Sequence, residues 1–229
     1  MDTQCLLQLL QDGGLTVYPL TVGSIIALAI FVERLWRFRG IDQATRSLTK
    51  QIVNALVERD LPASRKLCQD SKTPVATIYL DAMRWKNIAV EDLERVLATS
   101  RQEAASDLKR GLWIVGTIGS LAPYVGLFGT VVGIIRAFQA MSLHGVGGFE
   151  VVAAGISEAL VATGAGLFVA ITALAFFNYL QVRVSSLSSV YSRSCERFVQ
   201  ALLYIESKSS ETNETNEESE ASDGRLVPA

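Results

Sequence analysis

The sequence has little of what enzymes and metal sites are built from. It has one histidine, His144, in a Gly-rich stretch, and three cysteines, Cys5, Cys68 and Cys195, which lie far apart without a CxxC pair. The odd cysteine count and the wide spacing argue against a disulfide framework or a metal site. No nucleophile–base pair, phosphate-binding loop or metal-ligand spacing is present. We therefore expect neither an enzyme nor a cofactor, and no nucleic-acid partner.

Charge is also missing from three long apolar runs. They are Leu15–Val32, Leu112–Ile135 and Ala159–Leu180. Each is long enough to cross about 30 Å of hydrocarbon as a helix. One such run could be a buried core helix, but three in a short chain favour a membrane protein. The fold class we predict is an all-α integral membrane protein with three transmembrane helices.

Basic residues are scarce on one side of the three runs, where only Arg136 lies nearby. No Lys or Arg precedes the first run or lies in 139–150. Because a signal peptide needs a basic start, we expect the first run to be a retained helix. The flanking basic residues are Arg34, Arg37, Arg39, Lys109, Arg110 and Arg183. By the positive-inside rule, the N-terminus and 139–150 face the periplasm of a bacterial inner membrane, and the C-terminus faces the cytoplasm.

The predicted layout alternates spans with helical cytoplasmic segments. Helical apolar spacing in 89–110 predicts a helix that runs without a break into the second span, and 181–208 should likewise prolong the third. Pro62 and Pro74 mark turns between shorter helices. The segments, in order, are a periplasmic N-terminus 1–14, transmembrane helix 15–36, cytoplasmic helical region 37–111, transmembrane helix 112–138, periplasmic loop 139–150, transmembrane helix 151–180, cytoplasmic extension 181–208 and a disordered acidic tail 209–229.

Small residues form a stripe along the second span. Its members, three or four positions apart, are Gly119, Ala122, Gly126, Thr130, Gly133 and Ala137. Gly129 and Gly133 form a GxxxG pair, and small residues let helices approach closely in lipid. Thr130 is the polar point of the stripe. Its hydroxyl can bond back to its own helix or face a polar path, and the sequence leaves both open.

Glu158 directly precedes the third apolar run, which extends back through it to Val151. On a helix it shares a face with Gly155, Ala162, Ala165 and Val169, and Thr172 lies on nearly the same face. Thr163 lies five positions further, about 140° around the helix. An intramembrane carboxylate faces a bundle interior or water, so Glu158 either holds helices together or lines an ion path. The runs contain no second acid, His or Lys, so a complete proton relay requires an oligomer or a partner helix.

The segments "LAPYVGLFGTVVGIIRAF" and "AAGISEALVATGAGLFVAI" resemble the two signature spans of the ExbB/TolQ proteins, relatives of the flagellar stator subunit MotA. The resemblance covers about 97–178, and the opening of the chain resembles the shorter first-span form of ExbB-like chains. In the third span, Thr172 stands near where the family usually has proline. By motif position Thr130, Glu158 and Thr163 match the family's polar pore residues, and Pro123 matches its proline in the second span.

The resemblance implies a proton-channel motor subunit. In this family a homopentamer surrounds the paired transmembrane helices of a small ExbD- or TolR-like partner, a single-span protein that carries an intramembrane aspartate. The expected function is use of the proton motive force to energise TonB-dependent outer-membrane transport. The alternatives are Tol–Pal constriction, a gliding motor, or a non-conducting scaffold. We expect Thr130, Glu158 and Thr163 to line the path, and Pro123, Gly126, Gly129, Gly133 and Thr172 to set packing or bends.

Overall fold

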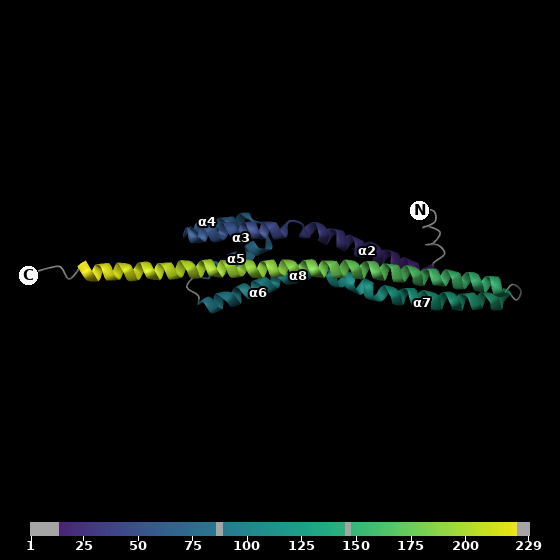
Figure 1. Ribbon diagram of the computed structural model, residues 1–229. Coiled ribbons are helices and arrows are strands. Elements are labelled where there is room, and N and C mark those ends of the chain that lie inside the picture. Colours follow the sequence, from purple (N-terminus) through teal and green to yellow (C-terminus); the bar gives the residue numbers. More distant parts are fainter. Residues whose placement is uncertain (1–13, 86–88, 145–147, 224–229) are drawn as a thin grey trace, which may run out of the picture. The chain divides into compact units, whose positions relative to one another are not determined.

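The computed structural model describes residues 14–85, 89–144 and 148–223. They are helical apart from short turns, and they divide into two compact units. Unit 1 contains the chain up to Phe38 together with Lys109–Arg183, and unit 2 contains Arg39–Leu108 with the chain from Val184 onward. Figure 1 shows the helices of both.

Unit 1 is a set of three apolar helices. They are α2 (Gly14–Phe38), α7 (Leu112–His144) and the first part of α8 (Gly148–Asp223). Within the described residues, three helices are long and apolar enough to cross a membrane. The predicted all-α membrane fold is therefore confirmed.

The core of unit 1 is made of small and medium apolar side chains. One cluster joins Leu20 of α2, Ala122 of α7 and Ala170 of α8, and a second joins Ala27, Val115 and Ala173. Large side chains instead point outward, including Tyr124, Phe168 and Ile171. This reversal of the soluble pattern suits lipid, which solvates large apolar side chains while small ones bring the helices together.

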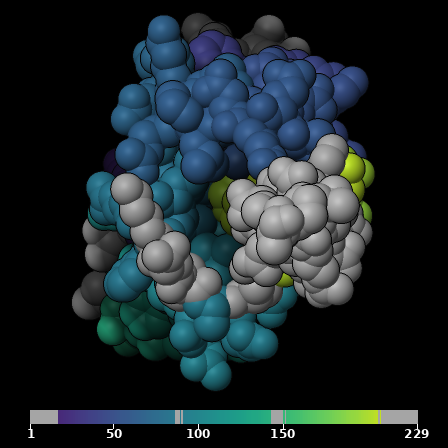
Figure 2. All heavy atoms as spheres, turned by 90° about the vertical axis from the view of Figure 1, so that its left-hand side faces the viewer, coloured from purple at the N-terminus to yellow at the C-terminus, as the bar shows by residue number. Residues whose placement is uncertain are grey.

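Unit 2 is built from α3 (Ile41–Val57), α4 (Leu61–Asp70), α5 (Pro74–Ala82), most of α6 (Val90–Lys109) and the later part of α8. The blue helices α3 and α4 lie side by side in Figure 2. The predicted turns are confirmed at Pro62 and Pro74, which stand in the first turns of α4 and α5. Asp60 caps α4, because its Oδ1 accepts a 2.9 Å hydrogen bond from the Ala63 amide.

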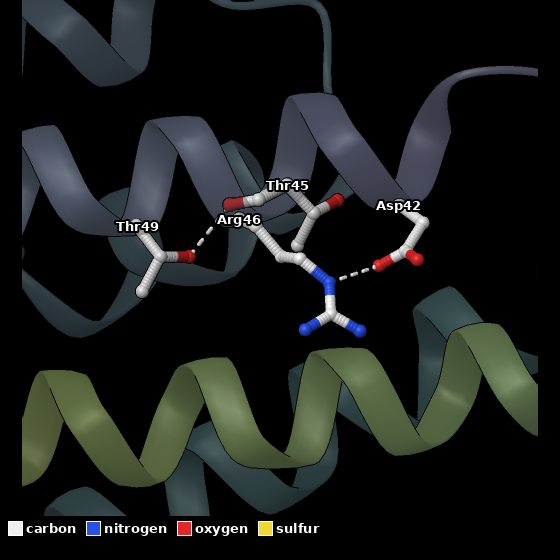
Figure 3. A network of polar contacts seen from close by, with 4 residues as sticks. All are labelled: Asp42, Thr45, Arg46 and Thr49. Carbon is white, nitrogen blue, oxygen red and sulfur yellow. Dashed lines mark hydrogen bonds and ion pairs between the residues drawn. The ribbon is translucent and has the colours of Figure 1, made fainter.

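Local contacts reinforce α3. Arg46 Nε donates to Asp42 Oδ1 at 2.6 Å, an i,i+4 ion pair, and Thr49 Oγ1 donates to the Thr45 carbonyl at 2.7 Å (Figure 3). Thr49 Oγ1 also lies 2.9 Å from the hydroxyl oxygen of Tyr79, which is fully buried, and the two hydroxyls share their two protons among this contact and their carbonyl partners. The Tyr79 hydroxyl donates to the Ser194 carbonyl of α8 at 3.0 Å, so this network ties α3, α5 and α8 together.

The buried groups of this core stay neutral. Burial raises the pKa of the Cys68 and Cys195 thiols from 9.0 to about 11 and that of Tyr191 from 10.0 to about 12. Burial also raises the pKa of Tyr79, against the lowering effect of its hydrogen bond with Thr49. We therefore assign this core to folding rather than to thiol chemistry.

Three predicted details of the helices differ from the structure. The first is the helix predicted to run from 89–110 into the second span without a break, which is wrong. Helix α6 ends at Lys109 and α7 begins at Leu112, because Gly111 has a φ of +81°, a left-handed conformation that ends a helix. The second is the predicted loop 139–150, which is largely helical, since α7 runs to His144 and α8 starts at Gly148. The predicted extension of the third span does occur, as α8 is continuous through 181–208.

The third difference concerns the acidic tail. The sequence predicts disorder over 209–229, whereas α8 continues to Asp223. A helix that is already formed adds residues at little entropic cost, and Glu and Ala have good helix propensity. The end of this prediction, 224–229, lies outside the described residues, as does the predicted periplasmic segment up to residue 13.

Candidate functional site

The contact between α7 and α8 is a seam of small residues that face each other in reciprocal pairs. A Cβ placed on Gly133 would stand 2.6 Å from the Cβ of Ala159, and a Cβ on Gly155 would stand 2.6 Å from that of Ala137. Both distances are far below an ordinary carbon–carbon contact of about 3.5–4.0 Å. Each glycine is therefore required by the alanine opposite, and the two backbones come close.

Backbone meets backbone where two glycines of the seam face each other. A Cβ on Gly166 would stand 2.8 Å from the Ala122 carbonyl oxygen and 2.9 Å from the Gly126 Cα. Both obstacles are backbone atoms, so no rotamer change can relieve the clash. Backbone packs directly on backbone at this crossing, about midway along the α7 seam.

Thr163 uses its hydroxyl at the same crossing. Its Oγ1 donates a 2.8 Å hydrogen bond to the carbonyl oxygen of Gly126. That carbonyl has a second lone pair free beyond the helical hydrogen bond, and the absence of a side chain on Gly126 opens the approach. Thr163, expected from its motif position to line an ion path, therefore lies at the contact between two helices.

The seam of α8 is displaced from the face that the sequence suggested. Gly155, Ala159 and Ala162 face or are buried towards α7, and Gly166, Ala170 and Ala173 continue this line. The sequence analysis placed Gly155 and Ala162 on the small face correctly but drew that face through Glu158, which lies one position, about 100° around the helix, before Ala159. As a result Glu158 lies on a flank of α8 beside the seam.

Glu158 is exposed on this flank of the protomer. Within the described part of the chain, it makes no hydrogen bond and no ion pair. On the side away from the seam, its neighbours on the helical wheel are two alanines and one valine: Ala154 is exposed, and Val161 and Ala165 are half-buried. A carboxylate that is flanked by side chains no larger than valine can be approached closely by water or by another helix.

Thr130 and Thr172 bond within their own helices. Thr130 Oγ1 donates to the Leu127 carbonyl at 2.7 Å, and Thr172 Oγ1 donates to the Phe168 carbonyl at 2.8 Å. Because Gly133 faces Ala159 in an antiparallel pair, Thr130 lies near the level of Thr163 and about one turn from Glu158. In the described residues no hydrogen bond links Thr130, Glu158 and Thr163.

The remaining predicted packing residues lie in the two helices without breaking them. Pro123 is half-buried inside α7, Gly129 is buried, and α8 passes through Thr172 without interruption. The sequence analysis missed Ala159 and Gly166 as seam residues. The signal was present, since Gly155, Ala159, Ala162, Gly166 and Ala170 repeat at intervals of three and four.

Over the residues that the structure describes, no group of three or more His, Cys, Asp or Glu side chains is arranged to hold a metal ion. The site is instead one carboxylate beside a small-residue seam in a three-span helical protein. These features are those of a three-span helical membrane protein with one carboxylate beside the packed seam of its spans.

The comparisons agree on the family. The sequence model of the MotA/TolQ/ExbB proton channel family matches residues 70–193, and the chain belongs to this family. A putative biopolymer transport protein ExbB-like 3 of Synechocystis sp. is 33% identical over 72% of this chain and 80% of its own length. The biopolymer transport protein ExbB of Pseudomonas putida is 30% identical over 81% of this chain and 57% of its own. The Tol-Pal system protein TolQ of Haemophilus influenzae is 37% identical over 47% of each chain.

Proposed function

We propose that this chain is a subunit of a proton-driven motor of the bacterial inner membrane, and that Glu158 lines its ion path. The observation that supports this is the place of Glu158: on the open flank of α8, beside small side chains and outside the packed seam. A charged side chain facing lipid at mid-membrane costs about 2.5–3.5 kcal/mol on insertion scales. Water in a channel, or a polar group on a partner, would remove that cost.

The protomer is incomplete as a proton relay. Apart from Glu158, the three apolar runs contain no acid, His or Lys that could pass a proton on. We propose that a homopentamer forms and that a single-span ExbD- or TolR-like partner supplies an intramembrane aspartate. The small side chains of Ala154 and Ala165, one turn before and two turns after Glu158 on the same flank, would let the helix of that partner approach.

The orientation belongs to the same proposal. The N-terminus and the α7–α8 turn face the periplasm, and unit 2 and the C-terminus face the cytoplasm, because the basic residues gather on that side. Cysteines introduced at Ser142 and Lys72, both exposed, test it in a protein that lacks native cysteines. An impermeant thiol reagent should label Ser142→Cys in intact cells and leave Lys72→Cys unlabelled. Labelling of the Lys72 position from outside would reverse the orientation.

The output we propose is energising of TonB-dependent outer-membrane transport. Relatives named ExbB or ExbB-like support it across more than two thirds of this chain. The second candidate is Tol–Pal constriction. It is favoured by the similarity to a TolQ protein, which extends over 47% of this chain. Expression in cells that lack either their ExbB or their TolQ separates the two: rescue of TonB-dependent uptake supports the first, and rescue of envelope integrity alone supports the second.

Substitution of Glu158 tests the ion path. Glu158→Gln keeps the shape and removes the charge, and we expect it to abolish proton flux and energised transport while the oligomer stays assembled. Glu158→Ala should do the same. The matched control is Glu150→Gln, an exposed glutamate in the first turn of α8, which should retain more than half of the activity. Flux is read in proteoliposomes that contain the partner, and oligomer size by light scattering.

The outcomes separate a motor from a scaffold. Full activity in Glu158→Gln would defeat the ion-path role. Loss of the oligomer in Glu158→Ala, with normal behaviour of Glu158→Gln, would make Glu158 a packing residue of a non-conducting scaffold.

A further inference from the structure

Arg34 carries a buried guanidinium without a hydrogen bond. Its side chain, near the end of α2, is 9% exposed, and its Nε and Nη1 atoms are buried with no partner. The nearest carboxylate is that of Glu33, whose Oε2 lies 3.7 Å from Nε, too far for a hydrogen bond. Glu33 is 56% exposed and also faces Arg37 at 3.8 Å, so it offsets little of the Arg34 charge.

Arg34 lies at the end of the span, at the membrane depth of the lipid headgroups. It follows directly after the uncharged run Leu15–Val32. Two tryptophans at the same end of unit 1, Trp36 of α2 and Trp113 of α7, are 72% and 68% exposed. Exposed tryptophans of membrane proteins concentrate at the interface between hydrocarbon and headgroups. Arg34 therefore lies at the depth where lipid phosphates are found.

Other cations of unit 1 gather at this end. Phe31 contacts Tyr179 with ring centroids 6.0 Å apart, and Arg34 and Arg183 each follow this contact by one helical turn. Arg183 Nε is likewise buried and lacks a partner. Lys109 and Arg110 are exposed just before Gly111.

Gly111 gives the guanidinium an approach to the surface. A Cβ at Gly111 would stand 3.6 Å from Arg34 Nη2, the one guanidinium nitrogen that is not fully buried. The left-handed φ of +81° at Gly111 turns the chain here, between α6 and α7. A ligand over this turn would therefore meet Nη2 first.

We propose that this basic end of unit 1 binds the phosphate of an anionic phospholipid, with Arg34 as the main donor and Arg183 beside it. A guanidinium in a medium of low dielectric constant needs a counter-charge, and a phosphate oxygen accepts strong hydrogen bonds from arginine. Anionic lipids supply phosphate at this depth, where Lys109 and Arg110 add attraction. The inference does not depend on ion conduction by the chain.

The test uses the full-length purified protein in detergent and three probes: phosphatidylglycerol, phosphatidylcholine and inorganic phosphate. Native mass spectrometry counts bound lipid, and thermal unfolding measures stabilisation. We expect phosphatidylglycerol to bind and to raise Tm more than either other probe. Arg34→Gln should weaken its binding about 10-fold or more, since a charge-assisted hydrogen bond is lost. The control Arg37→Gln removes the same charge from an exposed position and should change binding less than about 2-fold.

The remaining outcomes are decisive too. If Arg34→Gln does not fold, Arg34→Lys keeps the charge, and an intermediate loss of phosphatidylglycerol binding would support the proposal. Equal binding of phosphatidylglycerol and phosphatidylcholine, or unchanged binding in Arg34→Gln, would overturn it. Stabilisation by inorganic phosphate equal to that by phosphatidylglycerol would mark a site for free anions and would also overturn it.

Discussion

Exchanging the members of one glycine–alanine pair would test whether the α7–α8 seam depends on reciprocal shape. Gly133→Ala places a new methyl group 2.6 Å from the Ala159 Cβ, about 1 Å short of an ordinary contact. Neither group can rotate away, so the helices must separate locally by about that distance. Separation would also stretch the 2.8 Å hydrogen bond from Thr163 to Gly126, which lies two turns along α7.

Two effects of this substitution oppose each other. Overpacking of this kind costs about 1–3 kcal/mol. Replacement of a helical glycine by alanine contributes about 1 kcal/mol in the other direction. We therefore expect Gly133→Ala to lower the free energy of unfolding by roughly 0–2 kcal/mol. Ala159→Gly alone should also destabilise, through a lost contact and a more flexible backbone.

The double variant Gly133→Ala/Ala159→Gly moves the methyl group to the opposite helix and keeps one glycine in the pair. It should recover most of the lost stability, with a coupling energy of about 1–3 kcal/mol. Unfolding is followed by circular dichroism in mixed micelles of mild detergent and dodecyl sulfate. Gly164→Ala is the matched control, because a Cβ there meets nothing within 4 Å. A coupling energy near zero, or equal effects of Gly133→Ala and Gly164→Ala, would refute the reasoning.

Three further predictions use the same unfolding measurements. Thr163→Val removes the bond to α7 and should destabilise by about 0.5–1.5 kcal/mol, whereas Thr172→Val, whose hydroxyl bonds within α8, should change stability less; equal effects would contradict this. Tyr79→Phe removes the hydroxyl that donates to the Ser194 carbonyl and contacts the Thr49 hydroxyl, and it should destabilise unit 2 by about 1–3 kcal/mol, so an unchanged Tm would be inconsistent with the network. Burial raises the pKa of Cys68 and Cys195 from 9.0 to about 11, so stability is fully present below about pH 9 and is lost as the pH rises towards 11. Alanine at both cysteines should flatten that loss of Tm, and an equally steep loss would contradict it.

The membrane-spanning helices could be predicted from the sequence because the length of an apolar run and its lack of charge are local properties. Leu112–Ile135 predicts α7 without any knowledge of its neighbours, and Pro62 predicts the start of α4. The break at Gly111 could not be predicted in this way. Glycine is tolerated inside helices, the apolar spacing runs through "KRGLW", and only the surrounding packing selects a left-handed φ.

The face of α8 that packs on α7 was predicted only in part, for a related reason: Gly155 and Ala162 are in the seam, but the predicted face runs through Glu158 and the observed seam through Ala159. Small residues occur on two faces of the helix, with Ala154 and Ala165 beside Glu158 and with Ala159 and Ala162 on the face that packs. A periodic pattern of small residues therefore fits either face. What decides is the counterpart on α7, where Gly133 fits Ala159, and that pairing depends on the register between two helices.

The displaced seam gives Glu158 and Thr163 different tasks. Thr163 donates its hydrogen bond to Gly126, and the reciprocal glycines hold α7 and α8 at a fixed distance. Such a seam cannot open without loss of several contacts at once, so it supplies a rigid wall. Glu158 lies beside that wall, on a flank where small side chains leave room for water or a moving partner helix. A proton path needs both properties together: a carboxylate held at a constant position, and free space next to it. The rotation of one residue between Glu158 and Ala159 is what separates the fixed face of α8 from the open one.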